Sequence, residues 1–368
     1  MSYIFRSDEV NVGDRVVVRR DLGNGVHSDV IGHITACDPE TLEIRPQSVG
    51  GFPSTLPSIS IAQDAVVIIK KLSPRRVRNS EIRAIEIATA AAFPGIAHEW
   101  TSDGQWLLRA GDGITERSNS AAPLGASAGL AAVPWDEILS FYQRHDLPVQ
   151  VLLPERIARS AAGLCQPPAW EFGPEILVLT RPLPAAAPDV STGTPAGSSS
   201  QASNTRAQRT PMSPVPLPLP PATVPEGFHA EVLEQPDAAW LARYNFRGTP
   251  LPQQALELLQ RQIQGILGFG RIVHTATQRT VAITRATITD GYLGFSAVEV
   301  DPDFRRQGLG RALGQYMLHW GVAHGAHTAY LQVVASNVAG QKLYESLGFV
   351  EHHRHHYAVL KDAAAFQV

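Results

Sequence analysis

The sequence has little cysteine and no long hydrophobic run. Only 2 of its 368 residues are Cys, and Cys37 and Cys165 belong to no CxxC pair or Cys/His spacing, so neither a disulfide framework nor a zinc site is indicated. No window offers ~18 uninterrupted apolar residues, and Met1 to Val10 has no apolar stretch of signal length. We therefore expect a cytoplasmic protein that neither spans a membrane nor holds a metal.

An excess of basic charge is also lacking. The formal net charge is -3 and the pI is about 6.5, whereas a nucleic-acid-binding face needs clustered positive charge. Lysine is scarce and occurs only at positions 70, 71, 342 and 361. We treat the more numerous arginines as informative only inside a motif, and we expect no nucleic-acid partner.

Composition divides the chain into several regions. Residues 184–225 are rich in Pro, Ser and Ala and predict a disordered linker, because such a segment cannot bury enough apolar surface to offset its ordering entropy. Residues 1–73 predict a small barrel of SH3 type, since short strand-like runs at 15–19, 31–35, 41–44 and 65–69 alternate with turn residues.

Residues 75–183 predict a middle α/β domain without an obvious catalytic cluster. Its expected helices cover 80–93 and begin again at Pro134, and its expected strands are 105–109, 114–118, 149–153 and 176–180. The run Gly125-Ala126-Ser127-Ala128-Gly129 matches the G-x-S-x-G nucleophile elbow, which needs a strand leading directly into a helix. Prolines on both sides and small residues between them favour a loop instead.

Residues 226–368 carry the chemistry. Expected strands at 229–233, 272–275, 280–287 and 292–300 enclose helical runs at 237–244 and 252–264. After the last of these strands, Arg305-Arg306-Gln307-Gly308-Leu309-Gly310-Arg311 opens a helix. Unpaired N–H groups at a helix start suit a diphosphate, glycines permit its close approach, and Arg306 and Arg311 can add charge-assisted contacts.

A second motif follows at a suitable distance. Leu331 to Ala335 predict a strand, Asn337 predicts a helix cap, and that helix ends before Gly348. Ala335 through Phe349 resembles motif B of the GNAT superfamily of N-acetyltransferases, and Arg305 to Gly310 resembles its motif A. The local sequence of both motifs is especially similar to the branch that acetylates ribosomal-protein amino termini. The resemblance implies an α+β (α/β) chain with a C-terminal GNAT acyl-CoA N-acyltransferase fold.

The order of elements in the middle region is comparable, so we interpret it as a possible degenerate GNAT half that lacks R-x-x-G-x-G. An SH3-like first domain before such units also resembles a multidomain bacterial GNAT group. The resemblance implies acetyl-CoA as the acetyl-donor cosubstrate, with these contact residues: Val298, Glu299, Val300, Arg305, Arg306, Gln307, Gly308, Leu309, Gly310, Arg311, Asn337 and Tyr344.

Tyr344 is the candidate general acid, because a phenol can donate a proton to a thiolate leaving group. The alternative for Tyr344 is a core aromatic role, and Asn337 can be a plain helix cap. The base is open. Where the ribosomal-protein branch has a glutamate, this chain has Gln332, which cannot accept the proton of the amine. Glu299 is the nearest carboxylate by sequence, and water-mediated deprotonation is the competing route.

Four histidines, at positions 352, 353, 355 and 356, invite a metal interpretation. On a strand, His353 and His355 would share one face and the other two the opposite face, so the four cannot converge simply. We expect a solvated strand that lines the acceptor cleft, with a possible relay role for one imidazole.

The expected function is direct acetyl transfer from acetyl-CoA to a primary amine of a small molecule or protein, without a covalent enzyme intermediate. The alternative is a non-catalytic acyl-CoA-binding sensor whose N-terminal domains dock a partner. The acceptor and the oligomeric state stay open.

Overall fold

The computed structural model describes residues 10–47, 51, 53–54, 56–72, 77–185, 218–246, 249–261, 263–362 and 366. Most of the predicted linker therefore lies outside the described residues. The chain divides into two compact units. The first contains residues 1–77, and the second contains residues 78–186 and 216–368. Among the described helices, none is long and apolar enough to cross a membrane.

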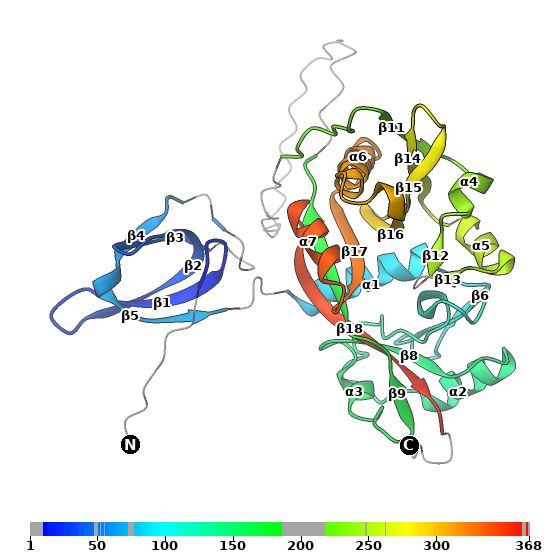
Figure 1. Ribbon diagram of the computed structural model, residues 1–368. Helices are drawn as coiled ribbons and strands as arrows, with labels where there is room; N and C mark the ends of the chain where they lie inside the picture. Colours follow the sequence, from blue (N-terminus) through cyan, green and yellow to red (C-terminus); the bar gives the residue numbers. More distant parts are fainter. Residues whose placement is uncertain are drawn as a thin grey trace, which may run out of the picture. The chain divides into compact units, whose positions relative to one another are not determined.

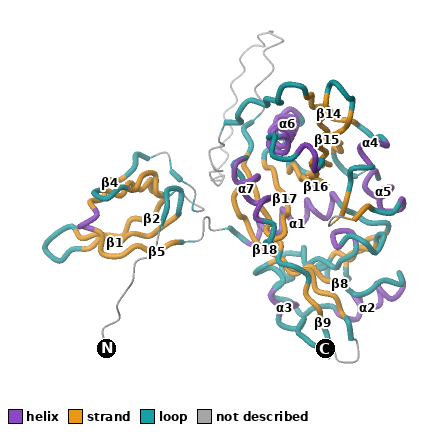
Figure 2. Tube along the Cα trace, in the orientation of Figure 1, coloured by secondary structure: helices purple, strands orange, loops and turns teal. Residues whose placement is uncertain are grey.

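The first unit is one antiparallel sheet with the strand order β4-β3-β2-β1-β5. Figure 2 draws its strands in orange. Its strands are β1 (Arg15–Asp21), β2 (His27–Cys37), β3 (Thr41–Pro46), β4 (Ile59–Ala62) and β5 (Val66–Lys71). Alternate residues such as Val16, Val18, Leu42 and Ile44 are buried together, as the period of a half-buried strand requires. The four predicted strands are confirmed and β4 was missed; the SH3-like assignment stays a prediction.

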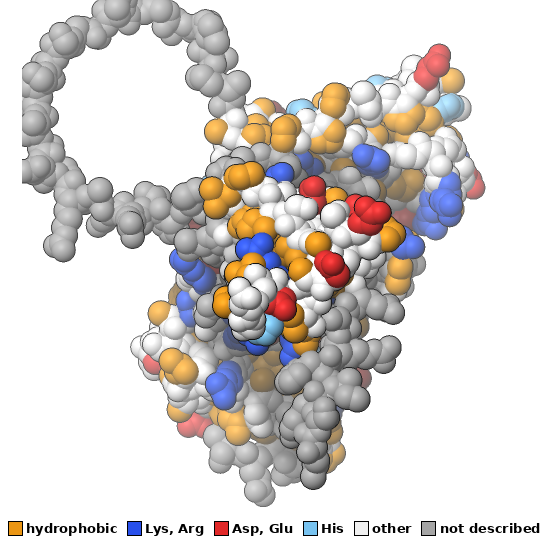
Figure 3. All heavy atoms as spheres, turned by 90° about the vertical axis from the view of Figure 1, so that its left-hand side faces the viewer, with side chains coloured by type: hydrophobic (Ala, Val, Ile, Leu, Met, Phe, Trp, Pro, Cys, Tyr) orange, Lys and Arg blue, Asp and Glu red, His pale blue; other side chains and the backbone are white. Residues whose placement is uncertain are grey.

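The surface of the first unit carries both signs of charge. Arg19 pairs with Asp29 and Lys71 pairs with Asp14, each at 2.8 Å. On the face drawn in Figure 3, basic and acidic side chains are interspersed among hydrophobic and neutral ones.

The second unit is built on a nine-stranded sheet with the order β11-β14-β15-β16-β17-β10-β18-β8, in which β9 also pairs with β18 (Figure 1). Its strands are β8 (Gln150–Pro154), β9 (Trp170–Phe172), β10 (Ile176–Pro182), β11 (Phe228–Leu233), β14 (Ile266–His274), β15 (Arg279–Thr289), β16 (Tyr292–Val300), β17 (Thr328–Val334) and β18 (Val350–Leu360). Two separate hairpins are formed by β6 (Ala97–Trp100) with β7 (Leu107–Ala110) and by β12 (Asn245–Phe246) with β13 (Thr249–Pro250).

The helices of this unit are α1 (Asn79–Ala92), α2 (Trp135–Arg144), α3 (Arg159–Ala162), α4 (Ala238–Leu241), α5 (Gln253–Gln260), α6 (Leu309–Ala323) and α7 (Val338–Ser346), with 3₁₀ turns η2 (Glu116–Ser118) and η3 (Pro302–Phe304). The expected strand 114–118 is wrong, because Asn119 holds this segment in a loop by accepting from the Gly111 and Gly113 N–H groups. Ser127 lies in a turn, as expected for a loop and not for a nucleophile elbow.

A strand from the middle region is inserted into the C-terminal part of the sheet. Strand β10 pairs antiparallel with β17 on one side and with β18 on the other, and β18 then pairs with β8 and β9. The middle region is therefore not a separate compact unit from 226–368, and the predicted boundary between them is wrong. Short-range sequence pattern cannot show this, because the paired strands are more than 140 residues apart.

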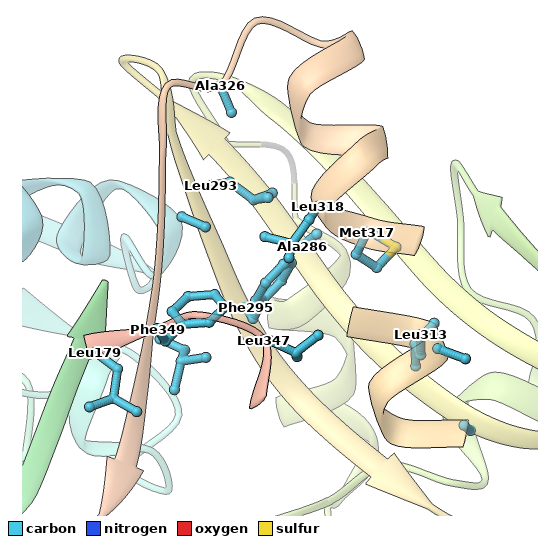
Figure 4. Packing of buried hydrophobic residues seen from close by; sticks show 14 of the residues in the cluster. Leu179, Ala286, Leu293, Phe295, Leu313, Met317, Leu318, Ala326, Leu347 and Phe349 are labelled. Carbon is cyan, nitrogen blue, oxygen red and sulfur yellow. The ribbon is translucent and has the colours of Figure 1, made fainter. Parts of the chain in front are cut away.

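Helices α6 and α1 cover opposite faces of the sheet. Ala286 and Ile288 of β15 belong to the core that α6 closes, and Figure 4 shows Leu313, Met317 and Leu318 of α6 in the same layer as Phe295 and Leu347. Arg285 and Thr289, which precede and follow these two residues on the strand, donate hydrogen bonds to backbone carbonyls of α1. Successive side chains of a strand point to opposite faces, so α1 packs on the face that α6 does not cover.

The end of the predicted linker is ordered against α6. His319 Nε2 lies 2.8 Å from the Pro220 carbonyl oxygen, and Arg181 Nη2 donates to the Pro218 carbonyl oxygen at 3.3 Å. Leu219 and Val224 pack against the core beneath α6. A disordered tether does not describe residues 218–225, because their apolar side chains find a surface to cover.

Candidate active site

Strands β16 and β17 begin side by side and then separate. They pair in parallel register from Tyr292–Thr328 to Phe295–Leu331, while β16 continues to pair with β15 as far as Val300. Ala297 has φ +55° at a register shift in this stretch, and such a bulge bends the strand. Within the described ranges, no strand pairs with residues 296–300 on the β17 side, and an extended amide-containing chain could cover this strand edge.

Helix α6 begins close to the end of this edge. Its N-cap, Gly308, has φ +79°, a backbone conformation that favours glycine, and Arg306 also has a positive φ of +66°. Among the described residues, neither Arg306 nor Arg311 has an ion-pair partner, and both are exposed. A helix start with unpaired N–H groups and two available guanidinium groups suits a diphosphate.

Arg305 has a different role from its neighbours. Its Nη2 donates to Glu299 Oε1 at 2.9 Å, and its Nε donates to the Val300 carbonyl oxygen at 3.0 Å. Arg305 therefore braces the connection between β16 and α6, and three predicted cofactor contacts already engage one another. Because this ion pair holds its carboxylate, Glu299 is a poor candidate for the base.

A narrow cavity lies on the α6 face of the sheet, between β16 and helices α6 and α7. Val298 of β16, Gly310 of α6 and Tyr344 of α7 line it together with Phe295 and Met317. Three residues predicted from two distant motifs thus meet in one place. A Cβ added at Gly310 would lie in ordinary van der Waals contact, 3.4 Å from Leu343, so packing between α6 and α7 alone does not require glycine here.

Tyr344 is half-buried in this cavity, and its ring centroid lies 6.0 Å from that of Phe349. Burial raises the pKa of Tyr344 to about 12, so the phenol carries its proton throughout the neutral range. A protonated hydroxyl at this place can donate to a departing thiolate. The ring contact with Phe349 also agrees with a packing role, and the role of Tyr344 as a general acid stays a prediction.

Asn337 caps α7, as the sequence predicts. Its Oδ1 accepts from the Gly340 N–H at 2.9 Å, which satisfies one of the open donors of the helix. The side chain is exposed. Contact with a cofactor stays a prediction.

A second small cavity lies on the α1 face of the same split. Ser296 and Phe295 from β16 and Tyr330 and Gln332 from β17 line it, together with Thr89 of α1 and further residues discussed below. Gln332 Nε2 lies 3.5 Å from Thr89 Oγ1. Helix α1 and the 3₁₀ turn η2 of the middle region thus close the side of the split opposite the phenol of Tyr344.

The histidine cluster is buried, which corrects the expectation of a solvated strand. His353 Nε2 and His355 Nδ1 both lie within hydrogen-bond distance of Glu86 Oε1, at 2.8 and 2.7 Å, and all three side chains are fully buried. The expected shared face of His353 and His355 is confirmed. His352 is the extra residue of a bulge against β10, and its Nδ1 lies 2.7 Å from His353 Nδ1.

The ligand atoms of Glu86, His353 and His355 lie within 4.8 Å of one another. Both imidazoles already engage Oε1 by hydrogen bonds, so we assign no ion to it. Burial raises the pKa of Glu86, but attraction to His355 and hydrogen bonds from both imidazoles outweigh it and hold this pKa well below its usual range. Sequence reasoning missed Glu86, since nothing near it in the chain marks it as a partner of β18.

The fold and the site define an acetyltransferase of the GNAT superfamily. Residues 79–358 match the family described as "Probable histone acetyltransferase Rv0428c C-terminal". The chain is also 32% identical, over 94% of its own length and 94% of the other, to the probable histone acetyltransferase Rv0428c of Mycobacterium tuberculosis. The chain therefore belongs to this family of acetyltransferases.

Other similarities are more local or concern the fold. The [ribosomal protein bS18]-alanine N-acetyltransferase of Escherichia coli is 47% identical over 70 residues, which cover 19% of this chain and 46% of that protein. A GCN5-related N-acetyltransferase from Kribbella flavida has the same fold, with a TM-score of 0.52 at 16% identity over 77% of this chain and 96% of the other.

Proposed function

We propose that this acetyltransferase uses acetyl-CoA and transfers the acetyl group directly to a primary amine. The observation that carries the proposal is the split between β16 and β17, which has the N-terminus of α6 at its end and Val298, Gly310 and Tyr344 around its cavity. Acetyl-CoA supplies the acetyl group as a thioester. The open edge of β16 would hold its extended amide-containing arm, and Arg306, Arg311 and the first N–H groups of α6 would hold its diphosphate.

The amine must attack as the free base. Gln332 cannot take its proton, and the carboxylate of Glu299 is held by Arg305. We therefore assign the proton to water that reaches the split, and Tyr344 donates to the sulfur as the thioester bond breaks. This arrangement needs no covalent enzyme intermediate, because amine and thioester meet at the split from opposite faces of the sheet.

The test is release of free thiol from acetyl-CoA in the presence of amino acids, polyamines, aminoglycosides and short peptides. Amine-dependent release with a matching acetylated product supports the proposal. Tight acetyl-CoA binding with no release for any amine would overturn it and favour the acyl-CoA-binding sensor instead.

Removing the two available guanidinium groups at the start of α6 should weaken cofactor binding. We expect Arg306→Gln with Arg311→Gln to raise the Kd for acetyl-CoA by about 10-fold or more at low salt, because each loses a charge-assisted contact. Isothermal titration at several salt concentrations measures this, and the double variant should be less sensitive to salt. Arg19→Gln, in the first unit, is the matched control and should leave Kd unchanged; an unchanged Kd in the double variant would contradict the diphosphate assignment.

A further inference from the structure

A third cavity, larger than the two at the split, lies beside α1 within the second unit. Its volume is about 470 Å³, which falls within the range of roughly 300–1,000 Å³ that is typical of small-molecule sites. Its main walls are the C-terminal half of α1, the β6–β7 hairpin and residues 261–264 before β14. We call it the hairpin cavity.

Helix α1 separates the hairpin cavity from the split. Ile87, Ala90 and Ala91 line the hairpin cavity, whereas Thr89 and Phe93 line the small cavity between β16 and β17. At 3.6 residues per turn these two sets point to opposite sides of the helix axis. The hairpin cavity also shares no lining residue with the cavity around Tyr344, so it is a site apart from the one proposed for acetyl-CoA.

Large apolar side chains are exposed around the mouth of the hairpin cavity. Ile87, Ile96 and Trp100 are 39%, 60% and 48% exposed, and all three line it. The buried side chains of Leu107 and Leu124 continue the apolar wall inward. Exposed apolar side chains that gather around a hollow mark a surface that another molecule can cover, so we expect the ligand to have an apolar body.

The ionisable groups of the hairpin cavity are all basic. His98, Arg109 and Arg261 line it, and none of its lining residues is a carboxylate. The exposed Arg261 donates from Nη1 to the Gly95 carbonyl oxygen at 3.2 Å, which holds the guanidinium group against the wall. Among the described residues, Arg261 has no ion-pair partner. Its guanidinium group is therefore available to an anion.

Arg109 places a second positive charge behind this wall. Its side chain is only 1% exposed. Nη2 donates to Ser120 Oγ at 3.0 Å, while Nη1 has no hydrogen-bond partner in the described part of the chain. Burial lowers the pKa of Arg109, although the carboxylate of Glu86 acts in the opposite direction. Because Nη1 is itself covered, we expect an anion to contact Arg261 directly and to feel Arg109 through its charge.

We propose that the hairpin cavity binds a small carboxylate with an aromatic or branched aliphatic body. The guanidinium group of Arg261 would hold the carboxylate by two parallel hydrogen bonds. Ile87 and Trp100 would cover the apolar body and remove it from water. This proposal does not depend on acetyl transfer, since the site lies on the other side of α1 from the split.

The experiment titrates 4-phenylbutyrate and 4-methylpentanoate, and the amide of each, into the full chain by isothermal calorimetry. The Kd of each carboxylate should be at least about 10-fold lower than that of its amide, because hydrogen bonds between charged partners are the stronger ones. Arg261→Gln should reduce this preference to within about 3-fold. Arg261→Lys should recover only part of it, because lysine cannot form the bidentate contact.

Arg144→Gln is the matched control, since Arg144 also lies on the surface of the middle region and pairs with the exposed Glu99. It should keep the wild-type preference. Ile87→Asp tests the apolar wall and should raise the Kd of every carboxylate and amide by about 10-fold or more. Its control is Leu130→Asp, because Leu130 is 89% exposed and lies outside the cavity, and this variant should bind like the wild type.

Saturating acetyl-CoA should leave the Kd of each carboxylate unchanged, which separates the hairpin cavity from the split. Three results would overturn the proposal: no binding of either carboxylate, an unchanged preference in Arg261→Gln, or displacement of the carboxylates by acetyl-CoA. Each of them would leave the proposed acetyl transfer intact, because thiol release from acetyl-CoA is measured without these ligands.

Discussion

Tyr344→Phe should lower kcat by about 100-fold or more and leave the Kd for acetyl-CoA within about 2-fold of the wild-type value. The substitution removes one hydroxyl and keeps the ring against Phe349, so packing is preserved. General acid catalysis typically contributes about 10² to 10⁴ in rate. Single-turnover kinetics with the best amine of the panel, together with titration of acetyl-CoA, measure both quantities.

The pH profile gives a second test of the same residue. Because burial raises the pKa of Tyr344 to about 12, the phenol stays protonated between pH 7 and 10, and the wild-type kcat should not fall in this range through loss of the acid. Phe349→Leu is the control, since it alters the packing around the phenol and keeps the hydroxyl. A kcat that is equal in Tyr344→Phe and wild type would assign Tyr344 to packing alone.

The local motifs were sufficient to predict where helices α6 and α7 begin. Arg306 to Arg311 and Asn337 to Gly348 are each continuous in sequence, and the helix starts that they predict lie at Leu309 and Val338. Their signals are local because glycine conformation and helix capping depend on neighbouring residues. Whether these residues bind acetyl-CoA stays a prediction.

The cavity on the α1 face could not be predicted in the same way. Its residues Thr89, Phe93 and Arg117 come from a region that composition assigned to another domain, more than 150 residues before β16. The position of β10 between β17 and β18 explains how these segments come together. Val178 of β10 pairs with Gln332 of β17 on one side and with His353 of β18 on the other. A strand inserted from the middle region thus brings α1 over the split, and no period in the sequence specifies such a long-range pairing.

The bulge at His352 is another feature that the sequence pattern did not predict. Strict alternation along β18 places His353 and His355 on one face and His352 and His356 on the other, and we expected a solvated strand. The structure instead buries His352, His353 and His355. One extra residue in the strand shifts the register between Val178 and Leu179 and changes the local direction of the side chains. The polar face that results is closed by Glu86, so the sequence pattern looked like a solvated strand although the side chains form a buried network.

Glu86→Gln should strongly destabilise the second unit. Glu86 of α1 accepts from His353 and His355 of β18, which follow it by 267 and 269 residues. Removing one partner of a buried charged network typically costs about 3–5 kcal/mol, so we expect the unfolding free energy to fall by about 3 kcal/mol and Tm to fall by roughly 6–10 °C. Chemical denaturation and calorimetry at pH 7 measure the loss.

The acid dependence follows from the lowered pKa of Glu86. Its stabilising contribution is complete above the unfolded pKa of about 4.3 and is lost as the pH falls toward the lower folded value, so the gap between wild type and Glu86→Gln should narrow only below about pH 4.5. Glu171→Gln is the matched control, because the exposed Glu171 pairs with Lys361 at 3.1 Å on the surface and such pairs contribute at most about 1 kcal/mol. Equal loss in both variants would contradict the role of Glu86 in holding α1 on the sheet.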